Sequence, residues 1–171
     1  MEPSSASNGS WSPAIVYSSA LEGPFMLDTT DRRPRLPVAT GSGLAPMIAM
    51  LESAFSSGER IPTVLIHGVS FHGELAYRER IQTWLNGGLP LDYRPTVSRP
   101  REDRNAGWSG RAGRAETQLD ELMHEWRWLR AGGSVAYLCG NPDMTEACAS
   151  VLRAAQFAPH DIRVEHFHPP V

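Results

Sequence analysis

The chain has 171 residues, of which 41% are hydrophobic and 20% are charged, and its formal net charge is −3. These values are typical of one globular domain and give no general attraction to nucleic acid or to a membrane surface. Two cysteines, no apolar run long enough to span a membrane and no secretory signal at the N-terminus predict a cytoplasmic protein in a reducing compartment.

The first 34 residues differ from the rest of the chain. They open with a polar, serine-rich stretch that is typical of mobile termini. Two short extended pieces, at residues 14–17 and 25–27, look like remnants of a β element, because two strands alone are marginal in water. We therefore expect a flexible N-terminus over residues 1–34 and one folded domain over residues 35–171.

From residue 35 onward, apolar β-rich segments alternate with helical patterns. Strands are expected at residues 36–39, 62–67, 93–98, 134–138 and 162–167. Helices are expected at residues 45–56, 73–85 and 116–130, with a fourth that begins at Pro142. A basic, glycine-containing loop covers residues 100–113. This alternation predicts an α/β fold, a three-layer doubly wound sheet of five parallel strands with right-handed crossovers.

The turn after the first strand is a candidate phosphate site. It reads Thr40-Gly41-Ser42-Gly43-Leu44-Ala45-Pro46. Two glycines with a hydroxyl between them let the backbone approach a phosphate, and the helix that follows adds N–H groups and a favourable dipole. Tight turns also use glycine for geometry alone, and Pro46 stands where the G-x-G-x-x-G fingerprint has its third glycine.

The ends of the second and third strands indicate which dinucleotide the chain prefers. An NAD site usually places an acidic residue there, to hold the ribose hydroxyls. Here the second strand ends in His67-Gly68-Val69-Ser70, and the third in Ser98-Arg99, with Arg111 beyond the loop. A hydroxyl beside guanidinium groups suits a 2′-phosphate, although Arg99 and Arg111 also fit a solvated surface. That solvated reading is favoured for Arg101, Arg104 and Arg114.

The fourth strand leads into Cys139-Gly140-Asn141-Pro142. Asn141 fits a helix N-cap, and Pro142 fits the first helical position. Cys139 and Gly140 are therefore expected in a strand-to-helix turn at the carboxyl edge of the sheet, where α/β proteins bind ligands. A thiol there can contact a cofactor, and the alternative is a small buried hydrophobic side chain.

Together these segments resemble the NADP-binding half of ferredoxin-NADP reductases, especially the bacterial type, over about residues 23–167. The turn at 40–46 is similar to the family's pyrophosphate turn, T-G-[TS]-G-x-[AS]-P. Residues 67–69 and 74–77 are similar to its H-G-V-R and E-L-x-Y segments. Residues 97–99 and 110–111 resemble the V-[ST]-R-E and G-R that grip the 2′-phosphate. Residues 139–144 match C-G-x-P-x-M beside the nicotinamide.

The resemblance implies a set of site residues. Cys139 would pack against the nicotinamide, and Glu165, in a V-E pair near the C-terminus, would lie beside the hydride path. Phe167 would stack on the flavin as the terminal aromatic. The other implied cofactor-binding residues are Thr40, Gly41, Ser42, Gly43, Ala45, Pro46, His67, Gly68, Val69, Ser98, Arg99, Arg111, Gly140, Asn141, Asp143 and Met144.

The chain departs from the family pattern in three places. The R-x-Y-[ST] motif that holds FAD on the family's N-terminal β-barrel does not occur in the sequence, and residues 23–28 resemble only the last strand of that barrel. Most of the flavin domain is therefore expected to be missing. Ser70 stands where the bacterial family often has arginine, and Pro100 replaces the glutamate after Ser98-Arg99.

The resemblance implies an oxidoreductase that transfers hydride between NADPH and FAD and passes electrons to ferredoxin or flavodoxin. Two alternatives stay open, the reductase component of an oxygenase and a truncated, non-catalytic NADPH-binding module. A metal site is not expected. His166 and His168 alternate near His160 and Asp161, but this group offers no firm third ligand.

Overall fold

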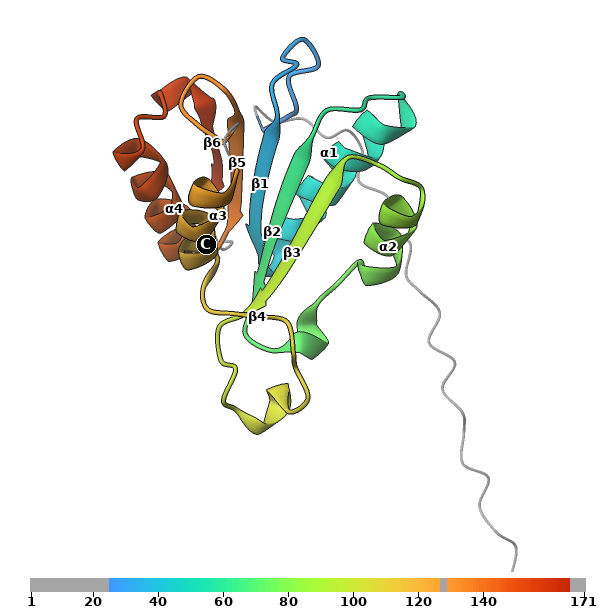
Figure 1. Cartoon of the computed structure of the whole chain (residues 1–171), viewed down its shortest axis with the longest axis vertical. Helices are drawn as coiled ribbons and strands as arrows, with labels where there is room; N and C mark the ends of the chain where they lie inside the picture. The colour runs from blue at the N-terminus through green and yellow to red at the C-terminus, as the bar shows by residue number, and fades with distance from the viewer. Residues whose placement is uncertain (1–24, 127–128, 167–171) are drawn as a thin grey trace, which may run out of the picture.

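The computed structural model describes residues 25–126 and 129–166. Within them six parallel strands form one sheet in the order β4-β3-β2-β1-β5-β6 (Figure 1). The strands are β1 (Arg35–Thr40), β2 (Thr63–Val69), β3 (Leu91–Val97), β4 (Arg111–Ala112), β5 (Val135–Gly140) and β6 (Ile162–His166). From β1 the strands are added toward one edge as far as β4, and then toward the other edge as β5 and β6, so the direction of winding reverses between β1 and β5. The predicted doubly wound parallel sheet is confirmed.

The sixth strand corrects the expected five. β4 lies in the segment that the sequence indicated to be a loop, and it pairs with β3 through Thr96↔Arg111 and Val97↔Ala112. Two residues are too short to show an alternating apolar pattern, so only the neighbouring strand defines β4. It carries the chain past the carboxyl end of β3 into the next helix.

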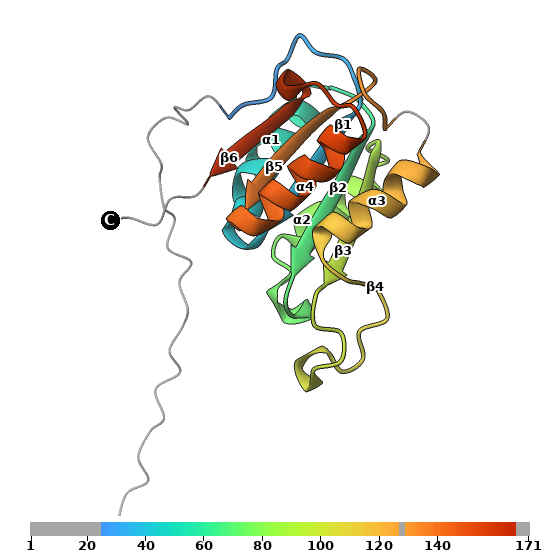
Figure 2. The same ribbon diagram turned by 90° about the vertical axis from the view of Figure 1, so that its left-hand side faces the viewer.

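Helices cover both faces of the sheet and complete the three layers. α1 (Leu44–Ser56) and α2 (Arg78–Asn86) pack on one face. α3 (Ala115–Glu125) and α4 (Pro142–Ala154) lie side by side on the other, as Figure 2 shows. This arrangement follows from the right-handed crossovers that parallel strands require.

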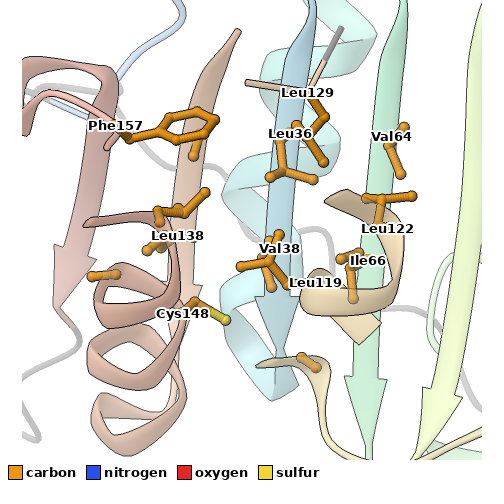
Figure 3. Packing of buried hydrophobic residues seen from close by; sticks show 14 of the residues in the cluster. Leu36, Val38, Val64, Ile66, Leu119, Leu122, Leu129, Leu138, Cys148 and Phe157 are labelled. Carbon is orange, nitrogen blue, oxygen red and sulfur yellow. The ribbon is translucent and has the colours of Figure 1, made fainter. Parts of the chain in front are cut away.

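The two cores reflect strands that are buried on both sides. Leu36 and Val38 of β1 pack toward Leu119 and Leu122 of α3, beside Cys148 of α4 (Figure 3). On the other face of the sheet, Leu65 of β2 and Tyr137 of β5 pack with α1 and α2. Strands covered on both faces read as continuous apolar runs, which is why the sequence indicated them clearly.

Two helix ends differ from the sequence expectation. A helix was expected from residue 73, but α2 begins at Arg78, because Tyr77 has a left-handed backbone (φ 57°) that interrupts a helix. α3 ends at Glu125 and not at residue 130, since Trp126 is extended. The Arg94 guanidinium lies over the Trp126 ring and pairs with Glu125, so contacts with β3 replace the last helical turn.

The described part of the N-terminal segment packs against the sheet without joining it. Phe25 meets Tyr137 of β5 edge-on, with ring centroids 6.1 Å apart. Arg163 of β6 donates a hydrogen bond to the Met26 carbonyl oxygen and pairs with Asp28. The extended piece expected at residues 14–17 lies outside the described residues. Within the described ranges, no helix is long and apolar enough to cross a membrane.

Candidate functional site

A cavity of about 840 Å³ lies at the carboxyl edge of the sheet, the lower edge in Figure 1. Residues 40–42 run from the end of β1 into the next turn, 68–70 from the end of β2 into the loop after it, and 98–99 follow β3. Residues 113–116 follow β4, and 140–144 run from the end of β5 into α4. The strand order reverses between β1 and β5 at the same edge, which is where open α/β sheets bind their ligands.

The turns after β1 and β5 are locked together at this reversal. The backbone N–H of Asn141 donates a hydrogen bond to Thr40 Oγ1, with 3.1 Å between the two atoms. Gly140 has φ +139°, and a Cβ there would clash with Thr40. A Cβ on Gly43 would come within 2.6 Å of the Gly140 nitrogen. Both glycines therefore permit the close packing of the two turns.

Two helices begin at the cavity. Asn141 caps α4 as predicted, because its Oδ1 accepts hydrogen bonds from the backbone N–H groups of Asp143 (2.8 Å) and Met144 (3.4 Å). Pro142 follows at the first helical position. α3 starts after Arg114, whose side chain makes no capping hydrogen bond. Helix N-termini favour anions, so both starts suit a phosphate-bearing ligand.

The expected 2′-phosphate residues divide between the cavity and its surroundings. Ser98 and Arg99 line the cavity. Arg111 is exposed on β4 and is not among the lining residues, while its carbonyl oxygen accepts a hydrogen bond from Trp108 Nε1. Arg114, for which the sequence favoured a solvated surface, does line the cavity. Its position between Gly113 and the start of a helix was the feature of the sequence that could have indicated a place in the site.

Several other predicted residues lie near the cavity without lining it. Gly43 is buried against β5, and Ala45 and Pro46 belong to the first turn of α1. His67 is buried within β2, and its Nδ1 lies 2.9 Å from the Tyr93 hydroxyl. Burial lowers the pKa of His67 to about 4, so its ring is neutral near pH 7.

Cys139 lies inside β5 and not in the expected turn. It is fully buried among residues of α1 and the sheet. Burial, and secondarily the Glu165 carboxylate, raise the pKa of the thiol to about 11. Cys139 and Glu165 are paired across β5 and β6, so the two predicted catalytic residues are neighbours just beyond the cavity lining. Phe167 lies outside the described residues.

Acidic side chains also line the cavity. Asp143 was expected there, but Glu74 and Glu116 were not identified as site residues. Glu116 lies 3.9 Å from Arg114, and Glu74 lies 3.6 Å from Arg104, measured between charged atoms. Within the described ranges, no cluster of three or more His, Cys, Asp or Glu side chains is placed to bind a metal. Beside these carboxylates, the cavity contains hydroxyls, guanidinium groups and the N–H groups of two helix starts, and these groups suit a phosphorylated ligand.

Comparison with protein families supports this chemistry. The family model described as "Oxidoreductase NAD-binding domain" matches residues 38–150. Ferredoxin--NADP reductase B of Sorangium cellulosum is 28% identical over 158 residues, which cover 90% of this chain and 62% of that protein. The toluate 1,2-dioxygenase electron transfer component of Pseudomonas putida is 32% identical over 136 residues, or 80% of this chain and 38% of that protein. The chain therefore spans less than two thirds of these relatives.

Solved structures show the same fold. The ferredoxin NADP+ reductase of Neisseria gonorrhoeae, with bound FAD and NADP, is 26% identical with a TM-score of 0.65, covering 79% of this chain and 56% of that one. A cytochrome P450 reductase from Amycolatopsis has a TM-score of 0.72 at 23% identity, covering 86% of this chain and 42% of that one. Both alignments cover most of this chain and about half of the larger protein.

Proposed function

This chain belongs to the oxidoreductase NAD-binding domain family, and we propose that its cavity binds NADP(H) for hydride transfer between NADPH and FAD. One observation carries the proposal. The ends of β1, β2, β3 and β5 meet in one cavity with two helix N-termini, and its lining includes a serine beside an arginine. The volume of about 840 Å³ lies within the usual range of cofactor sites.

The pyrophosphate would be held at the turn between β1 and α1. Gly41 and Ser42 line the cavity there, and the Thr40 hydroxyl fixes their distance from the start of α4. Backbone N–H groups in this turn and at the helix starts supply donors that match phosphate oxygens. Gly68 and Val69, which also line the cavity, would border the same ligand at the end of β2.

The 2′-phosphate would be bound by Ser98 and Arg99. The Ser98 backbone N–H is bonded to the Val69 carbonyl oxygen, so the end of β3 holds this pair beside β2. A hydroxyl and a planar guanidinium together match a phosphate dianion. Arg111, on the neighbouring β4, would add positive potential at the same end.

The nicotinamide would lie toward the ends of β5 and β6, near Cys139 and Glu165. Stacking of Phe167 on the flavin stays an expectation from the sequence. A thiol whose pKa is raised to about 11 stays protonated, and Cys139 is fully buried in β5, so it would support the strand end that faces the nicotinamide ring from behind and would not act as a nucleophile. Glu165, paired with it across the sheet, would place a carboxylate beside the hydride path. The bound NADPH would supply the hydride and the flavin would receive it.

The flavin and the electron acceptor come from outside the described residues in this proposal. A flavin-binding domain or a partner protein would bring FAD to the nicotinamide end of the cavity. Ferredoxin or flavodoxin would accept the electrons; the name of the Sorangium relative supports ferredoxin. Two free, buried cysteines fit a reducing, cytoplasmic compartment.

A second function has a specific observation in its favour. Relatives include electron transfer components of toluate and anthranilate dioxygenases. NADPH bound in the same cavity would then supply electrons, through the flavin, to an oxygenase component. Reduction of a ferredoxin, compared with reduction of an oxygenase component under the same conditions, separates the two functions.

Dinucleotide binding tests the central part of the proposal. We expect the chain to bind NADPH more tightly than NADH, and Arg99→Ala to weaken NADPH binding by about tenfold or more while NADH binding stays nearly constant. Arg111→Ala should have a smaller effect, because its side chain is outside the cavity lining. An unchanged preference for NADPH in the Arg99→Ala, Arg111→Ala double variant would refute the assignment.

Redox activity separates an enzyme domain from a binding module. NADPH-dependent reduction of ferricyanide should require added FAD together with a flavin-binding partner. If the chain binds NADPH but stays inactive with every flavin source, it is a non-catalytic module. A chain that is yellow as purified would show that it carries a flavin site of its own.

A further inference from the structure

Two loops meet beside the cavity around the ring of Phe71. Phe71 follows β2 and is only 7% exposed. The guanidinium carbon of Arg104 lies 3.5 Å from the ring centroid, and that of Arg99 lies 5.5 Å from it. Arginines that are five positions apart in the loop after β3 thus share one aromatic side chain.

Asn105 fixes this arrangement. The residue is 2% exposed, and its side-chain amide donates hydrogen bonds to the carbonyl oxygens of Ser70 (3.0 Å) and Arg99 (2.8 Å). Its Oδ1 accepts a hydrogen bond from the His72 backbone N–H at 2.7 Å. A buried amide with three partners ties the loop after β3 to the loop after β2, so the position of Arg104 is set by the fold.

The two guanidinium groups have little compensation for their charge. Arg99 contacts Glu102 at 3.5 Å, and Arg104 contacts Glu74 at 3.6 Å, both at the long end for an ion pair. Their side chains are 56% and 65% exposed, so solvent screens these contacts. Two cations at one ring repel each other, and most of their N–H donors remain available to a ligand. A phosphate dianion would neutralise this repulsion and accept hydrogen bonds from the available N–H groups.

We propose that Arg104 is a further specificity-determining residue, which binds the 2′-phosphate of NADP(H) together with Arg99. Phe71 holds the two guanidinium groups in place through cation–π contacts. The inference rests on the proposed function. It assigns to Arg104 a role that the sequence pattern did not indicate. Arg104, like Arg111, lies outside the cavity lining, but its guanidinium shares the Phe71 ring with that of the lining residue Arg99, so a phosphate bound by Arg99 lies within its reach.

Calorimetric titration of the full chain with NADP+ and with NAD+ tests this role. Arg104→Gln should weaken NADP+ binding by about tenfold, because one charge-assisted contact is lost, and should leave NAD+ binding within about twofold. Arg101→Gln is the matched control. It removes the same charge from an exposed position of the same loop and should change neither affinity. Equal NADP+ affinities in the two variants would overturn the proposal.

A gain of affinity provides a second test. Glu74→Gln removes the carboxylate that faces Arg104 and keeps an oxygen that can accept the Phe71 backbone N–H. NADP+ binding should tighten by about threefold relative to NAD+ binding. An unchanged ratio of the two affinities would contradict a phosphate contact at Arg104.

The outcomes distinguish this inference from the proposed function. If the unaltered chain prefers NADP+ and Arg104→Gln keeps that preference, only the role of Arg104 fails. If Arg104→Gln weakens NADP+ and NAD+ equally, Arg104 merely supports the loop, and the inference fails again. If the unaltered chain binds neither dinucleotide, the proposed function fails, and this inference fails with it.

Discussion

His67 and Gly68 are neighbours in the chain, and burial gives them different environments. Gly68 lines the cavity, whereas the His67 ring points into the core and meets the Tyr93 hydroxyl. The sequence placed both in one cofactor-binding motif, because a motif does not indicate which face of a strand a side chain takes. The alternation of β2 decides this, and it places the imidazole on the same face as Leu65, where Tyr93 also packs.

The buried imidazole predicts a pH-dependent stability. The pKa of His67 is about 4 in the folded chain and ordinarily near 6.5, so the unfolded chain binds the proton more readily. The free energy of unfolding should therefore fall as the pH is lowered from about 6.5 to about 4, by at most about 1.4 kcal/mol per pH unit from this group. Urea unfolding across this range measures the effect.

Two variants isolate the contribution of His67. His67→Gln keeps a polar group for Tyr93 but does not titrate, so the slope with pH should decrease by this amount. Gln82→Ala, at an exposed position of α2, removes no titratable group and should leave the slope unchanged. Identical slopes in the two variants would contradict the assignment.

At the scale of elements, the strands could be predicted more reliably than the helix ends. Buried parallel strands need continuous apolar segments, which the sequence shows directly. The start of α2 depends on the left-handed backbone of Tyr77. The end of α3 depends on the contact that Arg94 of β3 makes with Trp126. Contacts between distant segments decide both boundaries, and a local pattern does not contain them.

The N-terminus of α4 provides a test at this scale. Asn141→Ala removes the side chain that accepts hydrogen bonds from two backbone N–H groups, and it should lower the free energy of unfolding by about 1 kcal/mol. It should also weaken NADP+ binding, because the first turn of α4 lines the cavity. Asn141→Asp keeps the cap and should retain stability. Equal stability of all three forms would argue against the cap.

Across the whole molecule, much of the candidate site could be anticipated from the chain. The parallel topology brings the turns after β1, β2, β3 and β5 to one edge, so the segments with glycine and serine were expected to meet. Arg114 and Glu116 were missed because β4 delivers them, and β4 is only two residues long. The binding roles themselves stay predictions.

The opposite edge of the sheet contributes to stability. There Arg35, at the start of β1, is buried and pairs with Glu59 at 2.6 Å. Glu59→Gln leaves an uncompensated buried guanidinium and should lower the free energy of unfolding by about 3 kcal/mol, with unchanged NADP+ affinity. Glu52→Gln, which breaks the exposed pair with Arg80, should cost less than about 1 kcal/mol. Similar losses in chemical denaturation would contradict this difference.

Hydrogen exchange with and without NADP+ shows where the dinucleotide binds, and so whether it occupies the cavity at the carboxyl edge of the sheet. We expect slower amide exchange at the non-proline residues of 40–42, 68–70, 98–99 and 140–144, which line the cavity. No change is expected at residues 59–61 or 131–134, at the opposite edge of the sheet. Protection confined to the opposite edge, or binding without protection around the cavity, would contradict the placement of the dinucleotide.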